Sequence, residues 1–193
     1  MIGYKSFYKT IRIVTLAPIM ALITILLLYS TDRYIFKGIS NFIFSVIFFV
    51  IVPLLAYPLQ LIIPKIKSKG RIGQRKLAII MAVIGYILGI IYVIFMNITS
   101  ELMLMYLVYL ISGILIFIFN KILKIKASGH ACGVVGPIVY LGYFYKSYAL
   151  LGIPLIFIVY YSSIKMKRHS IKELLYGSIL PIIAFIISYF IVF

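Results

Sequence analysis

The sequence predicts an all-α protein: a polytopic transmembrane helix bundle with six to seven spans, forming a single integral membrane domain over residues 1–193. Three observations lead to this fold class. The 193 residues are 65% hydrophobic and 11% charged, whereas a soluble domain has roughly 45–50% apolar residues, and the mean hydropathy is +1.21. Apolar runs that approach the roughly 20 residues needed to cross a bilayer occupy most of the chain. The charged residues gather in short clusters between those runs.

Dividing the chain at its basic clusters gives seven candidate spans. The first run is long for the apolar region of a signal peptide, and no small-residue cleavage site follows it, so we expect it to be retained as a helix. The fifth and sixth runs are short for a bilayer, which is why the expected count is six to seven. In order, the spans are Ile11–Tyr29, Asn41–Ile63, Leu77–Met96, Leu102–Phe119, His130–Tyr145, Tyr148–Ile164 and Ile171–Phe193.

Glycine pairs with a spacing of four occur in two of the predicted helices. Gly85 and Gly89 lie in the third span, and Gly129 and Gly133 open the fifth, where Gly136 continues the same face. Small residues at this spacing let helices approach one another closely in a membrane. We therefore expect close packing at these positions.

The cations are distributed unevenly about the predicted bilayer. The formal charge is +16, from 19 Lys and Arg against three acids. In a soluble protein this charge would suggest nucleic acid, but these cations occupy short loops between spans, so no nucleic-acid partner is expected. With seven spans, only Arg33, Lys37 and Lys146 of the 19 cations fall on one side. The positive-inside rule therefore places the other cations, and the N-terminus, in the cytoplasm.

The two histidines of the chain both stand at the start of a predicted span. His130 follows Ser128 and Gly129, and His169 follows a basic cluster. The predicted topology puts both on the same membrane face. Glu173 lies four residues after His169, one helical turn, so its carboxylate can orient or stabilise the His169 ring.

This combination is typical of a site that cleaves phosphate esters. One imidazole attacks phosphorus and the other protonates the leaving oxygen. Ser128 and Gly129, just before a helix, favour an anion pocket because free N–H groups and the helix dipole face the phosphate oxygens. Nearby cations would stabilise the transition state, and the candidates are Lys121, Lys124, Lys126, Lys167 and Arg168.

Each of these features has a simpler interpretation when it is taken alone. A histidine in a basic loop can contact lipid headgroups. Lysine clusters set topology, and Glu173 can pair with Arg168 or Lys172. The phosphate-cleaving interpretation is favoured because the features occur together, at two helix starts on one face.

At these residues the sequence resembles the type 2 phosphatidic acid phosphatase superfamily, which includes the haloperoxidase-like lipid phosphatases. The pattern of that superfamily is K-x6-R-P, then P-S-G-H, then S-R-x5-H-x3-D. Ser128-Gly129-His130 matches the second part, with Ala127 in place of proline, and the third part aligns with Ser162, Ser163, His169 and Glu173. The resemblance covers residues 120–177. Ser163 stands where the pattern has arginine, and no K-x6-R-P is present, although the lysines before Ser128 resemble the compressed version of short microbial members.

The resemblance implies a role for each matched residue. His169 would be the nucleophile that forms a phosphohistidine, Glu173 its orienting acid and His130 the general acid. Ser128 and Gly129 would cradle the phosphate. The implied activity is hydrolysis of a lipid phosphate or isoprenoid diphosphate in the bilayer, without metal or cofactor.

Two other functions stay open at this point. The chain could be a degenerate member that binds or moves lipid without hydrolysis, for which Ser163 is the best support. It could also be a phosphotransferase of the same superfamily. The sequence does not indicate an oligomeric state.

Overall fold

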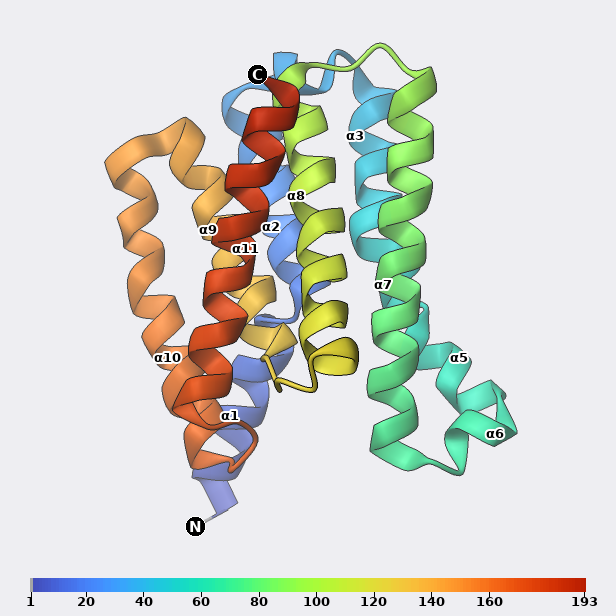
Figure 1. The fold of residues 1–193 in the computed structure, drawn as a ribbon, viewed down its shortest axis with the longest axis vertical. Coiled ribbons are helices and arrows are strands. Elements are labelled where there is room, and N and C mark those ends of the chain that lie inside the picture. Colours follow the sequence, from blue (N-terminus) through green and yellow to red (C-terminus); the bar gives the residue numbers. More distant parts are fainter. Residues whose placement is uncertain (1) are drawn as a thin grey trace. The chain divides into compact units, whose positions relative to one another are not determined.

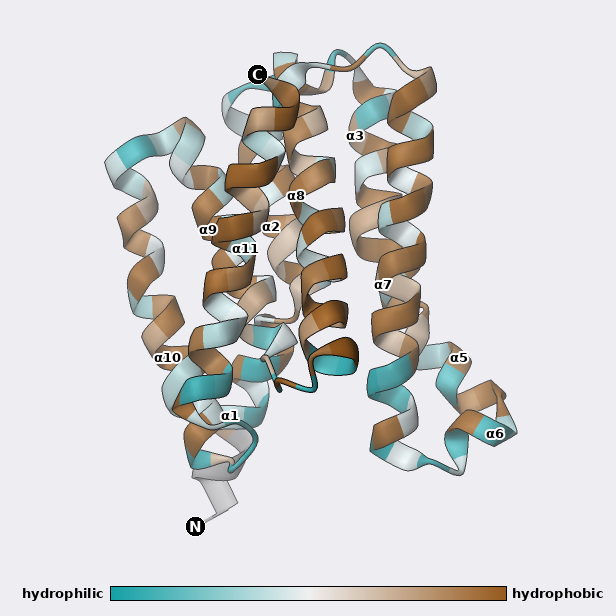
Figure 2. Ribbon diagram, in the orientation of Figure 1, coloured by the Kyte–Doolittle hydropathy of each residue, from teal (hydrophilic) through white to brown (hydrophobic). Residues whose placement is uncertain are grey.

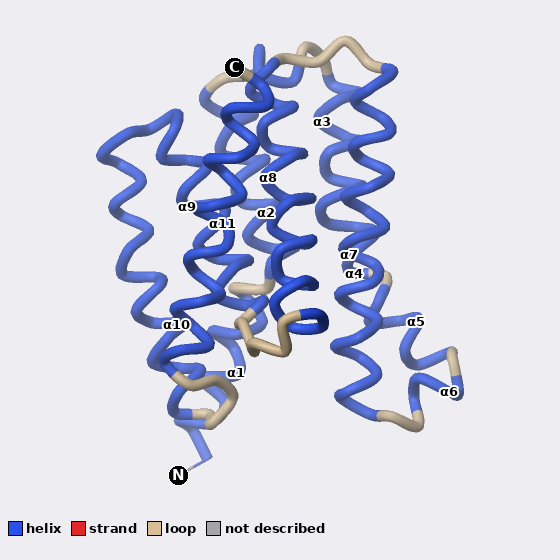
Figure 3. Tube along the Cα trace, in the orientation of Figure 1, coloured by secondary structure: helices blue, strands red, loops and turns tan. Residues whose placement is uncertain are grey.

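The computed structural model describes the backbone of residues 2–193 and the side chains of residues 7–193. In these residues the secondary structure is entirely helical, as predicted, and no strand occurs in the described range (Figure 3). The chain divides into two compact units, Met1–Met20 with Leu107–Phe193, and Ala21–Tyr106. We call them the site unit and the middle unit, and describe each by itself. The elements are α1 (Ile2–Val14), α2 (Ala17–Thr31), η1 (Arg33–Phe36), α3 (Ile39–Val46), η2 (Ile47–Ile51), α4 (Val52–Leu54), α5 (Ala56–Ile62), α6 (Pro64–Lys67), α7 (Gly70–Phe95), α8 (Ser100–Phe117), η3 (Ile118–Ile122), α9 (Gly129–Tyr145), η4 (Lys146–Gly152), α10 (Ile153–Lys165) and α11 (Ile171–Val192).

Five helical stretches in the described residues are long and apolar enough to cross a membrane, which marks an integral membrane protein. A sixth arises if Phe7–Val14 and Ala17–Thr31, which meet at an angle of 55°, form one bent span. This count takes Gly129–Lys165, a stretch of 37 residues that holds the two short spans predicted at 130–145 and 148–164, as one. Counted as the two helices α9 and α10, it brings the total to the predicted six or seven.

That 37-residue stretch is a hairpin, as Figure 1 shows. Lys146, with a left-handed φ of 48°, ends α9, and Pro154 follows at the start of α10. The two arms pack through Val134 and Val159, which share a buried cluster with Met20. Because the chain folds back, the start of α9 and the end of α10 lie at the same end of the site unit, and Lys146 lies at the other. At about 1.5 Å per residue, α10 is only about 20 Å long.

The site unit is completed by close packing of α9 against α11. A small buried cluster joins Cys132 of α9 and Leu180 of α11 to Ile116 of α8 and to Ala127 of the loop. A Cβ on Gly133 would lie 2.5 Å from the Cβ of Ala17, so this glycine permits a close helix contact as predicted. The prediction for Gly129 was wrong, because no atom lies within 4 Å of a Cβ built there.

In the middle unit, the stretch from α3 to α5 packs against α7. A Cβ on Gly85 would collide with the carbonyl oxygen of Phe48, and one on Gly89 would lie 2.5 Å from the ring of Tyr106. Both glycines therefore permit the predicted close approach. Figure 2 shows α7 as apolar along most of its length and hydrophilic toward its first turns, where the basic residues from Arg71 to Lys76 begin the helix.

The ends of the middle unit carry the loops in the predicted alternation. The Nζ of Lys37 donates to the Oδ1 of Asn97 at 2.6 Å. The first loop, between α2 and α3, and the third loop, between α7 and α8, therefore meet at one end. The basic stretch from Lys65 to Lys76 lies at the other end of α7, a helix of 26 residues. The assignment of either end to the cytoplasm stays a prediction.

Candidate active site

The first side of the candidate site is the start of α9. Ser128 caps this helix, with φ −80° and ψ 106°, and its Oγ accepts a hydrogen bond from the N–H of Ala131 at 3.3 Å. Ser128 is fully buried, whereas Gly129 is exposed. The space around a Cβ at Gly129 is open. A ligand can therefore approach the helix start at Gly129, while the hydroxyl of Ser128 is engaged in shaping it.

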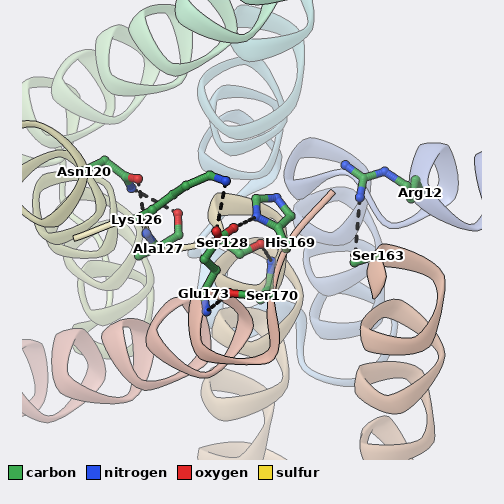
Figure 4. A network of polar contacts seen from close by, with 10 residues as sticks. Arg12, Asn120, Lys126, Ala127, Ser128, Ser163, His169, Ser170 and Glu173 are labelled. Atoms are coloured by element: carbon green, nitrogen blue, oxygen red, sulfur yellow. Dashed lines mark hydrogen bonds and ion pairs between the residues drawn. The ribbon is translucent and has the colours of Figure 1, made fainter. Parts of the chain in front are cut away.

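The loop before Ser128 is held by a residue that the sequence analysis did not single out. The side-chain amide of Asn120 donates to the carbonyl oxygens of Ile116, at 2.9 Å, and Ala127, at 3.1 Å. Its Oδ1 accepts from the N–H of Ala127 at 3.2 Å. Asn120 thus bonds both the N–H and the carbonyl oxygen of Ala127, and this fixes the position of the backbone at the neighbouring Lys126 (Figure 4).

The second side is the start of α11. Ser170 caps this helix by accepting from the N–H of Glu173 at 3.3 Å. The predicted histidine and acid pair is present: the Nδ1 of His169 and the Oε2 of Glu173 are 2.7 Å apart. The side chain of His169 is 6% exposed and that of Glu173 is 17% exposed. The ring of His169 is therefore held in one orientation with little access to water on the Glu173 side.

Contacts between the two helix starts join them into one site (Figure 4). The N–H of Ser128 donates to the carbonyl oxygen of Glu173 at 2.8 Å. A Cβ at Gly177 would collide with the carbonyl oxygen of Ser128, so only glycine allows this approach. The Nζ of Lys126 lies 2.9 Å from the Oε1 of Glu173. Four predicted residues, Lys126, Ser128, His169 and Glu173, are thereby brought together.

His130, the other histidine, contacts a residue of the N-terminal segment. Its Nε2 lies 2.9 Å from the Oγ1 of Thr15, and that hydroxyl donates to the carbonyl oxygen of Ile11 at 2.7 Å. A hydroxyl has a single proton to donate. Thr15 therefore accepts from His130, whose Nε2 carries a proton, and Nδ1 is the nitrogen whose protonation can change.

A guanidinium from another part of the chain contacts Ser163, the residue that aligns with the arginine of the pattern. The Nη1 of Arg12, on α1, donates to the Oγ of Ser163 at 3.3 Å. Ser163 is fully buried. Arg12 and His169 both lie close enough to His130 for their charges to act on its ring. A guanidinium therefore lies beside position 163 although the residue there is serine (Figure 4).

The structure does not bring the remaining predicted cations into this contact network. Lys121, Lys124 and Lys167 are exposed, and Arg168 is half-buried. Among the described residues, the side chains of these four make no ion pair. Lys121 lies in η3 and the other three lie in loops at the site end of the unit, where all four add positive charge.

Three residues of the site were missed by sequence reasoning: Arg12, Thr15 and Asn120. Arg12 was counted only as a topology signal. No spacing links Thr15 to His130, which lies 115 residues further along the chain. Asn120 carried a weak signal, a lone amide at the end of an apolar run directly before a basic loop.

In the part of the chain that the structure describes, no group of three His, Cys, Asp or Glu side chains is placed to hold a metal ion.

Comparisons with known proteins identify no relative. Comparison of the chain with protein-family models, with curated proteins and with solved structures finds no match.

Proposed function

We propose that this chain is a lipid phosphatase that hydrolyses a lipid phosphate or isoprenoid diphosphate through a phosphohistidine on His169. The observation that carries the proposal is the chain of contacts from Lys126 to Glu173 to His169 at the start of α11. A carboxylate on Nδ1 orients the imidazole and stabilises the charge that the ring gains when its other nitrogen attacks.

In the first step, Nε2 of His169 attacks phosphorus and the bond from phosphorus to the lipid oxygen breaks. His130, entering the step as the doubly protonated imidazolium, gives the proton of Nδ1 to that oxygen and becomes neutral, while its Nε2 keeps the hydrogen bond to Thr15. In the second step, water attacks phosphorus and gives a proton to His130. The bond from phosphorus to nitrogen then breaks and releases phosphate.

The charges around the two histidines suit the negative charge of a phosphoryl group. Arg12 offers a planar, bidentate donor beside the buried Ser163. Lys126 is more than half exposed at the mouth of the site. The N–H groups at Gly129 and the dipole of α9 add further stabilisation. Such donors, fixed before the reaction, are the main source of catalysis for phosphoryl transfer.

The location at the ends of apolar helices favours a substrate whose chain lies in the bilayer. The headgroup would reach the site end of the unit while the apolar part stays among lipids. The distribution of cations favours the cytoplasmic leaflet. This assignment rests on the charges alone.

The test is phosphate release from purified protein in detergent with a metal chelator. The panel contains isoprenoid diphosphates, phosphatidate and an inert phosphodiester. We expect release from at least one monoester or diphosphate, loss of release in His169→Asn, and normal release in Lys172→Gln, which removes an exposed cation from the first turn of α11.

Other outcomes separate the alternatives. No release from any lipid, together with saturable binding, would indicate a lipid-binding protein without hydrolysis. Transfer of phosphate to an added alcohol in preference to water would indicate a phosphotransferase. Release that survives His169→Asn would refute the proposed nucleophile.

A further inference from the structure

An open pocket of about 640 Å³ lies at the end of the middle unit where α2 finishes and α3 begins. This size is within the range of ligand pockets. None of its residues belongs to the candidate active site. They are Tyr29, Arg33, Tyr34, Lys37, Gly38, Ile39 and Asn97.

One wall of the pocket is aromatic and presents a guanidinium. The Tyr29 ring packs against those of Phe42, with centroids 4.2 Å apart, and Phe36, at 5.8 Å. The Cζ of Arg33 lies 5.5 Å from the centroid of the Tyr29 ring. This cation–π contact involves the face of the Tyr29 ring. Among the described residues the N–H groups of Arg33 make no hydrogen bond or ion pair, so its donor edge can serve a ligand.

The opposite wall presents an ammonium held by the third loop. The Nζ of Lys37 donates to the Oδ1 of Asn97 at 2.6 Å and to the carbonyl oxygen of Ile98 at 3.1 Å. A bond of 2.6 Å from the Oγ1 of Thr99 to the carbonyl oxygen of Ile35 ties the same loop to η1. An ammonium has three donors, and these two bonds fix its position with one donor to spare.

The charge balance of the pocket favours an anion. Asp32 is the nearest acid in sequence, and its Oδ1 accepts from the N–H of Tyr34 at 3.2 Å. Neither Arg33 nor Lys37 forms an ion pair with an acid among the described residues. The start of α3 at Gly38, which has no side-chain cap, adds the positive end of a helix dipole to the two cations.

We propose that this pocket binds a phosphate group between Arg33 and Lys37. A bidentate arginine with a lysine as a point charge is a pairing suited to phosphate oxygens. The phosphate can belong to an anionic lipid or be free in water. The lipid source is favoured because the pocket lies where two apolar helices end, beside Tyr34 and Ile39, whose side chains are 88% and 57% exposed.

The test uses a fluorescent reporter in the full chain. The sequence contains no tryptophan, so Tyr34→Trp introduces one indole at the pocket rim. The protein is placed in mixed vesicles of phosphatidylglycerol and phosphatidylcholine, in which only one of the two lipids carries bromine. Bromine quenches the indole fluorescence, so the quenching measures how often the brominated lipid occupies the pocket. We expect brominated phosphatidylglycerol to quench more strongly than brominated phosphatidylcholine. Arg33→Gln and Lys37→Gln should each lower this preference roughly fivefold, the value of one cation near a lipid surface.

Two controls separate the pocket from general charge and from misfolding. Arg75→Gln with Lys76→Gln removes two charges from the other end of α7 and should leave the preference unchanged. Arg33→Lys with Lys37→Arg keeps the charge and should keep most of the preference. An equal loss in the Arg75 and Lys76 control would overturn the proposal, because the selectivity would then be a property of the whole surface.

A final arm identifies the source of the phosphate. Inorganic phosphate is titrated against the Tyr34→Trp protein in a zwitterionic detergent. A saturable change without lipid preference would assign the pocket to soluble phosphate, and lipid preference without a response to phosphate would assign it to a headgroup. Absence of both responses would show that the pocket binds no phosphate.

Discussion

At the scale of residues, Glu173 is the centre of the proposed site. It is one of only three acids in the chain, and its two carboxylate oxygens contact different partners, Lys126 and His169. Its backbone carbonyl oxygen accepts a hydrogen bond from the N–H of Ser128. The same residue therefore orients the proposed nucleophile, positions a cation and joins the two helix starts.

Replacing Glu173 by Gln tests the first of these roles. The amide keeps the size of the side chain but loses the charge that stabilises the His169 ring. We expect kcat to fall roughly 10²- to 10⁴-fold, measured as phosphate release from the best lipid of the panel. Glu173→Asp, which keeps the charge and matches the superfamily pattern, should stay within about tenfold of the natural protein. Equal activity of the Gln and natural proteins would remove Glu173 from the mechanism.

Arg12 gives a second prediction at this scale. If its guanidinium binds the phosphoryl group, Arg12→Ala should cost about 2–4 kcal/mol of transition-state stabilisation in kcat/KM. Ser163→Arg alone should also lower activity, because it forces a second guanidinium into a buried position beside Arg12. The double variant should recover part of the loss, since one arginine again occupies the position.

The control for Arg12 is Lys9→Ala, which removes an exposed charge from the same helix. It should leave kcat/KM unchanged. Independent, additive losses in the Arg12 and Ser163 double variant would contradict the replacement of one arginine by the other.

The sequence predicted the pair of His169 and Glu173 from their spacing of four residues. In the structure His169 lies just before the cap residue Ser170, and Glu173 lies in the first turn of α11. The sequence also placed His130 and His169 on the same face through topology. It could not predict Arg12 or Thr15 as part of the site, because their contacts depend on how α1 packs beside α9 and α10. Residue spacing along the chain does not predict that packing. Lys126 could not be separated from Lys121 and Lys124 without the clamp that Asn120 forms on the loop.

At the scale of elements, most helices follow directly from the apolar runs, while the breaks within them do not. Pro154 and Gly152 mark the turn between α9 and α10, yet the sequence left open whether two spans of normal length were present. The 55° bend between α1 and α2 lies beside Pro18, the second residue of α2. Proline is a common cause of sharp bends, so the sequence indicates where this bend lies but not its angle.

The close approach of α11 to the loop at Ser128 can be tested with a pair of glycine substitutions. Gly177→Ala would drive a methyl group into the carbonyl oxygen of Ser128. We expect it to cost about 1–3 kcal/mol of stability through overpacking and to lower activity by displacing the start of α9. Thermal unfolding in detergent and phosphate release would measure the two effects.

Gly136→Ala is the matched control in the same pair of helices. Its Cβ would lie 3.4 Å from the Cβ of Pro181, which is an ordinary contact. This variant should keep its activity and unfold at or slightly above the temperature of the natural protein. If Gly136→Ala and Gly177→Ala behave alike, the close approach at Ser128 does not determine the geometry of the site.

At the scale of the whole molecule, the cations and the apolar helices together predict an orientation in the membrane. In each unit, successive loops lie at alternate ends, as expected for helices that cross a membrane in turn. The prediction that the site end faces the cytoplasm follows from the excess of Lys and Arg in those loops.

This orientation predicts a labelling pattern in intact cells. In a Cys132→Ala background, single cysteines at Lys69 and Lys124 should be shielded from an impermeant thiol reagent. A cysteine at Tyr34, whose side chain is 88% exposed, should react. Reaction at Lys124 and not at Tyr34 would reverse the orientation and move the substrate to the other leaflet.

The central claim, a covalent bond between phosphorus and His169, can be measured directly. Purified protein is mixed with a radiolabelled lipid phosphate, quenched in base within one turnover and digested for mass spectrometry. The account predicts a base-stable, acid-labile phosphoryl group on the peptide that contains His169 and its absence in His169→Asn. When His130 is lost, the group should accumulate with a substrate whose leaving group needs no proton, because only the attack of water is then slowed. Turnover of the labelled lipid with no phosphorylated peptide at any time point would contradict the account.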